Sequence, residues 1–298
     1  MRLIILIVFM PLLGMAQQKA MFTQYMFNGL VINPAYSAMD EAANITAVSR
    51  HQWVGFSGSP NTQTVSFHTP VKLSNTSVGV LLLRDQIGEV LTDNGAFLTA
   101  AQRIEISRDT YLALGVNGGI CQLKAGYSEL YDDVSGADPM FANENSQRFS
   151  MGFGLMLFSR KFFAGLSSPF FYESRGNSAV TVKGNKAHYL LQGGLLTPLN
   201  SNLLFKPTVL LKYVKGSPVE ADLNASVLLK QTIWIGASWR SFDSVDILTR
   251  FYITKYFDLG YSYDFTTTKL TRAEKGSHEI ALSCRIPVKG RNFPPCYF

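Results

Sequence analysis

Apolar and polar side chains alternate with a period of two along most of the chain after residue 42. Between residues 257 and 265, Phe, Leu and Tyr occupy every second position, and Asp, Gly and Ser lie between them. Residues 221–229 and 279–286 show the same alternation, with acids, amides and hydroxyls on one face and aliphatic residues on the other. Because successive side chains of a strand point to opposite faces, this pattern predicts half-buried β-strands.

Extending this interpretation along the chain predicts fourteen strands. They span residues 43–52, 62–70, 76–85, 94–107, 110–122, 147–158, 161–168, 187–198, 203–213, 220–230, 232–241, 245–254, 257–265 and 277–286.

The connections between these strands alternate in length. Every second one is short, and the three longest, residues 123–146, 168–186 and 266–276, fall at the same end of the strands. Short turns at one end and long loops at the other are typical of bacterial outer-membrane barrels. The sequence therefore predicts an all-β fold, an antiparallel transmembrane β-barrel of about 14 strands.

A soluble β-sandwich would produce a similar alternation. Aromatic residues near the strand ends favour the barrel, because membrane barrels carry interfacial girdles there. We assign to these girdles Phe162, Phe163, Phe170, Phe171, Tyr172, Tyr252, Tyr256 and Phe257.

The first residues predict the compartment. Arg2 precedes an apolar run from Leu3 to Leu13, and Gly14-Met15-Ala16 places small residues at a cleavage site before Gln17. The run is shorter than the roughly 20 residues that a membrane-spanning helix needs. We expect a cleaved signal peptide and a location in the bacterial outer membrane.

Four segments follow from these boundaries. They are a signal peptide at 1–16, a periplasmic or lumen-plugging segment at 17–42, the transmembrane barrel at 43–286 and a periplasmic tail at 287–298.

Composition adds little to this picture. Charged residues make up 16% of the chain and the formal charge is +6, but Lys and Arg are dispersed, which argues against nucleic-acid binding. We interpret them as residues of a wet lumen and of loops.

The odd number of cysteines and their spacing exclude a disulfide framework, and alternation places Cys121 toward the lumen and Cys284 toward lipid.

No motif indicates catalysis. The four histidines lie outside any HExxH pattern, and GxSxG and phosphate-binding glycine loops are missing from the sequence. We expect no catalytic, cofactor or metal site, and a protein that is not an enzyme.

Glycines within the strands, such as Gly115, Gly118, Gly119, Gly152 and Gly154, are attributed to curvature and bulges rather than to close approach of a plug.

Several segments are more specific than generic barrel sequence. They read FTQYMFNGLVINPAYSA at 22–38, SRHQWVGFSGSPNTQTVSFHTPV at 49–71, LLKYVKGSPVEADLNASVLL at 210–229, WIGASWRS at 234–241 and LGYSYDF at 259–265. With the final SHEIALS strand, they resemble the PorP/SprF family of type IX secretion and gliding-motility membrane proteins.

The resemblance implies a non-enzymatic outer-membrane component. Such a protein helps to secrete or anchor a large surface adhesin through the adhesin's C-terminal domain, or links the membrane to other, periplasmic, components of the type IX system. The alternative is a passive or substrate-specific pore, favoured by the Asp, Ser, Asn and Arg residues predicted to line the lumen.

Candidate partner-binding residues lie where strands enter the long loops. Aromatic and arginine side chains commonly anchor protein interfaces. The other expected partner is outer-membrane lipid, which contacts the outer wall of the barrel. The candidates are Arg50, Gln52, Trp53, Tyr127, Tyr131, Phe141, Tyr172, Arg175 and Arg272.

Overall fold

The computed structural model describes residues 21–72, 74–126, 143–174 and 186–291. The predicted signal peptide, its cleavage before Gln17 and the third cysteine, Cys296, lie outside these ranges. Within them, no helix is both long and apolar enough to span a bilayer.

The described residues form fifteen strands. These are β1 (Ala42–His51), β2 (Asn61–Pro70), β3 (Thr76–Ile87), β4 (Leu91–Ser107), β5 (Thr110–Ala125), β6 (Glu144–Ser159), β7 (Phe162–Glu173), β8 (His188–Leu195), β9 (Thr197–Asn200), β10 (Leu203–Val214), β11 (Glu220–Leu229), β12 (Ile233–Arg240), β13 (Ser244–Tyr252), β14 (Phe257–Thr266) and β15 (Ser277–Pro287).

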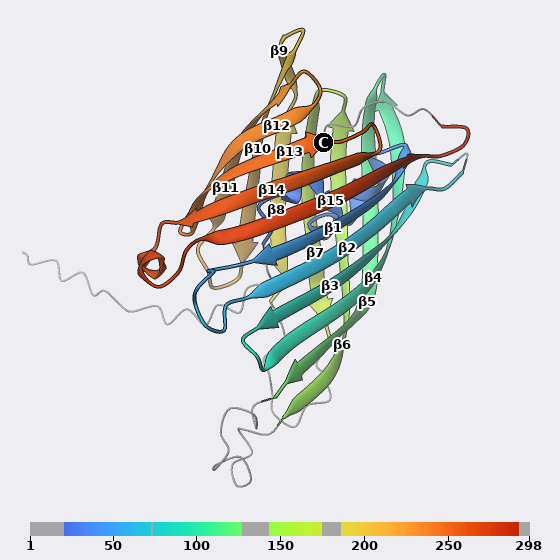
Figure 1. Ribbon diagram of the computed structural model, residues 1–298. Helices are drawn as coiled ribbons and strands as arrows, with labels where there is room; N and C mark the ends of the chain where they lie inside the picture. The colour runs from blue at the N-terminus through green and yellow to red at the C-terminus, as the bar shows by residue number, and fades with distance from the viewer. Residues whose placement is uncertain (1–20, 73, 127–142, 175–185, 292–298) are drawn as a thin grey trace, which may run out of the picture.

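The sheet closes on itself (Figure 1). Strands consecutive in the chain pair antiparallel, except β8 with β9, and β1 pairs with both β2 and β15. β8 and β9 are two parts of one wall strand, interrupted at Leu196, and both pair with β10. The predicted antiparallel barrel of 14 strands is therefore confirmed, with strand bounds within a few residues of those expected.

The two ends of the barrel differ. At the end called here the loop side, β5 is joined to β6 through residues 126–143, β7 to β8 through 174–187, and β14 to β15 through 267–276. At the opposite end, the turn side, two residues join β4 to β5 and two join β6 to β7. The three longest connections therefore share one end, as predicted.

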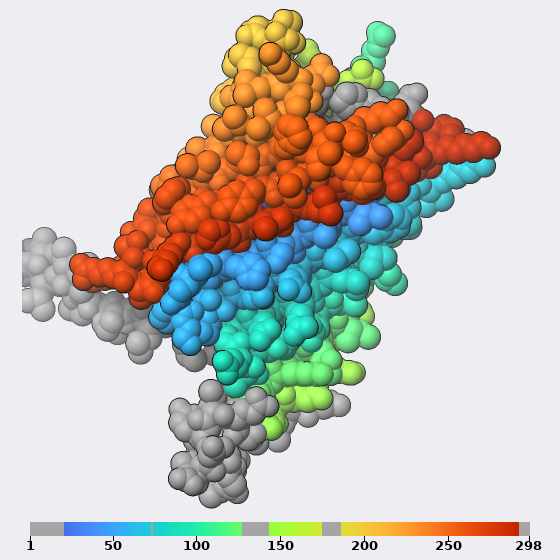
Figure 2. All heavy atoms as spheres, in the orientation of Figure 1, coloured from blue at the N-terminus to red at the C-terminus, as the bar shows by residue number. Residues whose placement is uncertain are grey.

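Alternation sorts side chains between the outer wall and the lumen. Leu98 and Val116 are 70% and 59% exposed on an apolar outer band, and Cys284 shares this face with Leu282. Cys121 is buried on the lumen face, so the two cysteines lie on opposite faces as expected. In Figure 2, β14, β15, β1 and β2 form a continuous wall.

The aromatic assignment needs correction at two positions. Phe163 and Phe170 are 8% exposed and point inward, where Phe163 packs against the plug and Phe170 against Phe97. The β6–β7 register shifts between Met151 and Phe153, so the facing of β7 changes after that point. Phe171 and Tyr172 remain exposed on the wall.

The segment before β1, residues 21–41, lies inside the barrel, shown in blue in Figure 1. We call it the plug. It consists of three short 3₁₀ turns, η1 (Tyr25–Phe27), η2 (Gly29–Val31) and η3 (Pro34–Ala38). Thr23 bonds to residues near the loop side, and Asp40 bonds to Arg285 near the turn side, so the plug runs down the lumen from loops to turns.

Candidate functional site: the plugged lumen

The η3 turn of the plug packs against β4 to β7. Ala35 and Ala38 contact Ala101, Ala113 and Met156 in one buried cluster. Small residues on both sides allow the plug backbone to approach the sheet closely, which explains how three 3₁₀ turns fit within the lumen.

Two strand glycines make this approach possible. A side-chain carbon at Gly115 would overlap with the backbone of Pro34 and Ala35, and one at Gly154 would overlap with the Asn33 side chain. Attributing these two glycines to curvature was therefore wrong. Gly152 differs, because its missing side chain leaves room for the backbone of Ser168 and Pro169 in irregular β7.

Asn33 fixes the turn that enters η3. Its side-chain oxygen accepts a hydrogen bond from the Ala35 amide at 2.9 Å, and Pro34 occupies the first turn, where no donor is needed. The side-chain amide nitrogen of Asn33 also donates to the Leu155 carbonyl at 3.2 Å. One residue thus caps the plug turn and ties it to the wall.

The other wall of the lumen, β10 to β15 with β1, is charged. Arg50 on β1 forms ion pairs with Asp264 at 2.7 Å and with Glu279 at 3.2 Å. Thr23 donates through its hydroxyl to Asp264 at 2.8 Å, and the Thr23 and Gln24 amides donate to Glu279 at 2.8 and 2.9 Å. We call Arg50, Asp264 and Glu279 the loop-side clamp, since they hold the first plug residues.

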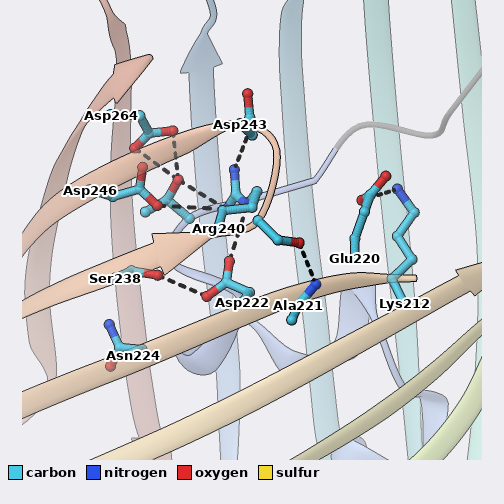
Figure 3. Close-up of polar contacts among 12 residues, drawn as sticks. Lys212, Glu220, Ala221, Asp222, Asn224, Ser238, Arg240, Asp243, Asp246 and Asp264 are labelled. Atoms are coloured by element: carbon cyan, nitrogen blue, oxygen red, sulfur yellow. Dashed lines mark hydrogen bonds and ion pairs between the residues drawn. The ribbon is translucent and has the colours of Figure 1, made fainter. Parts of the chain in front are cut away.

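A second arginine lies beside this clamp (Figure 3). Arg240 Nε lies 3.1 Å from Asp222, and its Nη1 lies 3.3 Å from Asp243. Ser238 donates to Asp222 at 2.8 Å. Acids and arginines of β11 to β14 thus neutralise one another where burial would make an unpaired charge costly.

Phe27 occupies the middle of the charged wall. The Lys206 ammonium lies 4.2 Å from the ring centroid, and the Arg250 guanidinium lies 4.4 Å from it. Two cations over an aromatic ring give an attraction that grows as water is excluded. The plug is therefore held on this side by an aromatic anchor as well as by hydrogen bonds.

The plug leaves the lumen through a pair of acids at the turn side. Asp40 accepts from Arg285 Nε at 2.6 Å, and Glu41 pairs with Arg103 and with Arg291 of the C-terminal tail. Burial alone would raise the pKa of Asp40, but Arg285 outweighs it and holds the pKa below its ordinary value. Burial and arginine contacts act on Glu41 in the same way, with a lowered pKa as the result.

The described residues leave small cavities beside the plug. Two cavities among the described residues measure about 60 and about 30 Å³, room for a few water molecules each. The larger is lined by polar groups including His68 and Asp40 near the turn side. The expectation of a wet lumen is thus wrong for the described part, where Asn224, for example, is 4% exposed.

The candidate partner-binding residues separate into three groups. Arg50 is 1% exposed inside the lumen and is committed to the clamp, so it does not contact an external partner. Gln52 and Trp53 lie in the β1–β2 connection, where the Trp53 amide donates to the Ser277 hydroxyl at 3.1 Å, and Tyr172 and Arg272 are exposed at the loop side. The others, Tyr127, Tyr131, Phe141 and Arg175, lie outside the described residues.

Sequence reasoning did not single out Thr23, Asp264 or Glu279. The two acids do follow the alternation, since each occupies the polar face of a strand. Their pairing with Arg50 joins residues more than 200 positions apart, which a pattern within one strand does not reveal. No group of three or more metal-ligating side chains occurs in the ranges that the structure describes.

Solved structures of a channel, an outer membrane protein and a transporter are similar to this chain. The monoaromatic hydrocarbon channel CymD has a TM-score of 0.52 and 11% identity, over 88% of this chain and 92% of that one. The Acinetobacter baumannii outer membrane protein Omp33 has a TM-score of 0.47 and 11% identity, over 84% and 100%. The Ralstonia pickettii toluene transporter TbuX has a TM-score of 0.49 and 10% identity, over 87% and 93%. At these identities the likeness is one of fold alone.

No curated protein sequence matches the chain. The sequence profile described as type IX secretion system membrane protein PorP/SprF matches residues 14–284, nearly the whole chain. The barrel lies in the outer membrane, and the chain belongs to the PorP/SprF family of type IX secretion system membrane proteins.

Proposed function

We propose that this barrel helps to secrete or anchor a large surface adhesin by binding the adhesin's C-terminal domain on the loop side. The observation that carries the proposal is the filled lumen: a plug clamped at both ends leaves the outer surfaces, not a channel, for function. Loops of outer-membrane barrels face the cell exterior, where an exported adhesin is held.

The proposed role is not enzymatic. The buried charges of the lumen are paired with one another or with the plug, so they act in structure. Other type IX secretion components are the second class of partner, and the turn side, with the Arg291 tail beside Glu41, is the surface that faces them.

A pore is the competing function. It is favoured only by the polar lumen face, and that face is occupied by the plug. A conducting state would require the plug to leave, which breaks the contacts of Thr23, Phe27 and Asp40 together.

Deletion of the gene tests the proposal. We expect surface proteomics of the deletion strain to show loss of one or more large exported proteins, restored by the wild-type gene, with general membrane integrity unchanged. An unchanged set of surface proteins would exclude the anchoring role.

A further inference from the structure

The short connections on the turn side carry cations. They are residues 71–75, 108–109, 160–161, 201–202, 230–232 and 253–256, and all but 201–202 contain a Lys or Arg. The sequence of these connections contains a single acid, Asp109. We call the exposed cations the turn-side ring, which consists of Lys72, Arg108, Arg160, Lys161, Lys230 and Lys255.

The turn-side ring extends around the rim of the barrel. Each of these connections joins two neighbouring strands of the closed wall, so the cations are spread along the rim and not gathered at one point. In Figure 1 the turn side is the upper end of the barrel. Arg160 lies 3.6 Å from Asp109, but both side chains are exposed, so water screens this pair. The rim on this side therefore has a surplus of positive charge.

The turn-side ring lies directly beyond the apolar outer band. Ile104 on β4 pairs with Leu112 on β5, and Leu112 pairs with Leu157 on β6, so the three form one outward apolar row. The β4–β5 and β6–β7 turns follow this row within a few residues. In the β13–β14 connection the Lys255 ammonium lies 4.9 Å from the centroid of the Tyr256 ring. Long cationic side chains and tyrosine at such a boundary place their charge at the level of lipid headgroups.

We propose that the turn-side ring binds the headgroups of anionic phospholipids in the periplasmic leaflet of the outer membrane. Phosphate oxygens accept charge-assisted hydrogen bonds from ammonium and guanidinium groups, and basic residues beside a membrane attract lipids with a net negative charge. A lipid leaflet surrounds the whole rim, as the cations do. The ligand is thus a phosphatidylglycerol-type lipid in preference to a zwitterionic one, whether or not the loops bind an adhesin.

An acidic periplasmic protein is the competing occupant. A protein that docks on this side would cover the mouth of the barrel, where the plug leaves the lumen. The charges there are paired with one another, Asp40 with Arg285, and Glu41 with Arg103 and Arg291. The cations of the ring lie instead at the rim, next to the apolar wall. Their position therefore favours lipid.

Removal of four lysines tests the turn-side ring. The turn-side variant carries Lys72→Gln, Lys161→Gln, Lys230→Gln and Lys255→Gln. The matched control carries Lys186→Gln, Lys215→Gln, Lys269→Gln and Lys275→Gln, which removes the same charge from exposed residues of loop-side connections. Native mass spectrometry of the full barrel, released from micelles with equal amounts of phosphatidylglycerol and phosphatidylethanolamine, counts the lipids that each protein retains.

We expect wild type and the control variant to retain phosphatidylglycerol over phosphatidylethanolamine by about threefold, and the turn-side variant to lose most of this preference. A wild-type barrel without the preference would overturn the inference and leave the acidic protein as the occupant. An equal loss in both variants would also overturn it, because the preference would then follow net charge and not the turns.

A photoreactive phosphatidylglycerol provides a second measurement on the wild-type barrel, should the turn-side variant fail to give a heat-modifiable folded form. The inference expects peptides that contain the turn-side connections to be labelled more than peptides from the loop side. Labelling that is equal at the two ends, or stronger at the loops, would contradict it.

Discussion

The Arg50 guanidinium lies 3.2 Å from the Glu279 carboxylate across the junction of the first and last strands, and both side chains are buried. The same carboxylate accepts the amides of Thr23 and Gln24. One acidic side chain therefore takes part both in the junction that closes the barrel and in the attachment of the plug.

Glu279→Gln should weaken the folded barrel by about 2 kcal/mol, because a buried arginine and two amides lose their charged partner while Asp264 remains. The measurement is the temperature at which the folded form disappears on semi-native gels. Glu89→Gln, at an exposed residue of the β3–β4 connection, is the control and should change nothing. Equal midpoints for both variants would show that the clamp is not needed for stability.

Gly154→Ala should displace the plug, because the added carbon overlaps with Asn33. We expect a loss of about 1–3 kcal/mol, typical of overpacking. Gly118→Ala is matched to it, since the nearest atom there is 3.9 Å away, an ordinary contact. Protease sensitivity of the plug in the purified barrel reports the displacement, and a plug equally protected in both variants would contradict the packing described.

The apolar outer band predicts that an arginine on the outward face of β5 destabilises the barrel more within the band than near the loops. Val116→Arg places a charge within the band and should cost about 2–4 kcal/mol, whereas Gln122→Arg, three outward positions nearer the loops, should cost less than about 1 kcal/mol. The yield of heat-modifiable barrel after folding into vesicles separates the two. Similar yields would mean that the wall meets lipid at a different level.

The direction of the plug predicts which side of the membrane an epitope joined to Met21 reaches. Met21 lines a cavity with Asp85 and Asp93 near the loop side, whereas the tail at Arg291 contacts the turn side. An epitope placed directly before Met21 should bind antibody on intact cells. The same epitope after Arg291 should bind only after the outer membrane is opened, and the reverse result would invert the barrel.

Alternation along each strand was enough to predict the strands, and the lengths of the connections and the aromatic residues at the strand ends distinguished a barrel from a sandwich. Residues 221–229, for example, form β11 with the predicted facing, so that Leu223 is 48% exposed on the wall and Asn224 is buried in the lumen. The break at Leu196 was not foreseen, because residues 187–198 read as one strand and the interruption leaves both halves paired with β10.

The interior was much less predictable. Residues 22–38 carry neither a period of two nor a helical period, since their 3₁₀ turns are shaped by the surrounding wall. Arg50 was placed at the surface because it precedes a loop, yet acids on two distant strands draw it inward. Gly115 and Gly154 show the same limitation. Each makes room for a plug residue, and the sequence around the glycine does not reveal which distant segment will lie against it.

The central claim is that the plug closes the lumen and the protein acts through its surfaces. Steady-state conductance of the purified full barrel in a planar bilayer tests this claim most directly. The structure predicts no steady current for wild type, and a stable ion-conducting channel once residues 21–39 are removed from a barrel that still folds. A steady current through the wild-type barrel, comparable with that of the plug-deleted one, would contradict the claim and favour the pore.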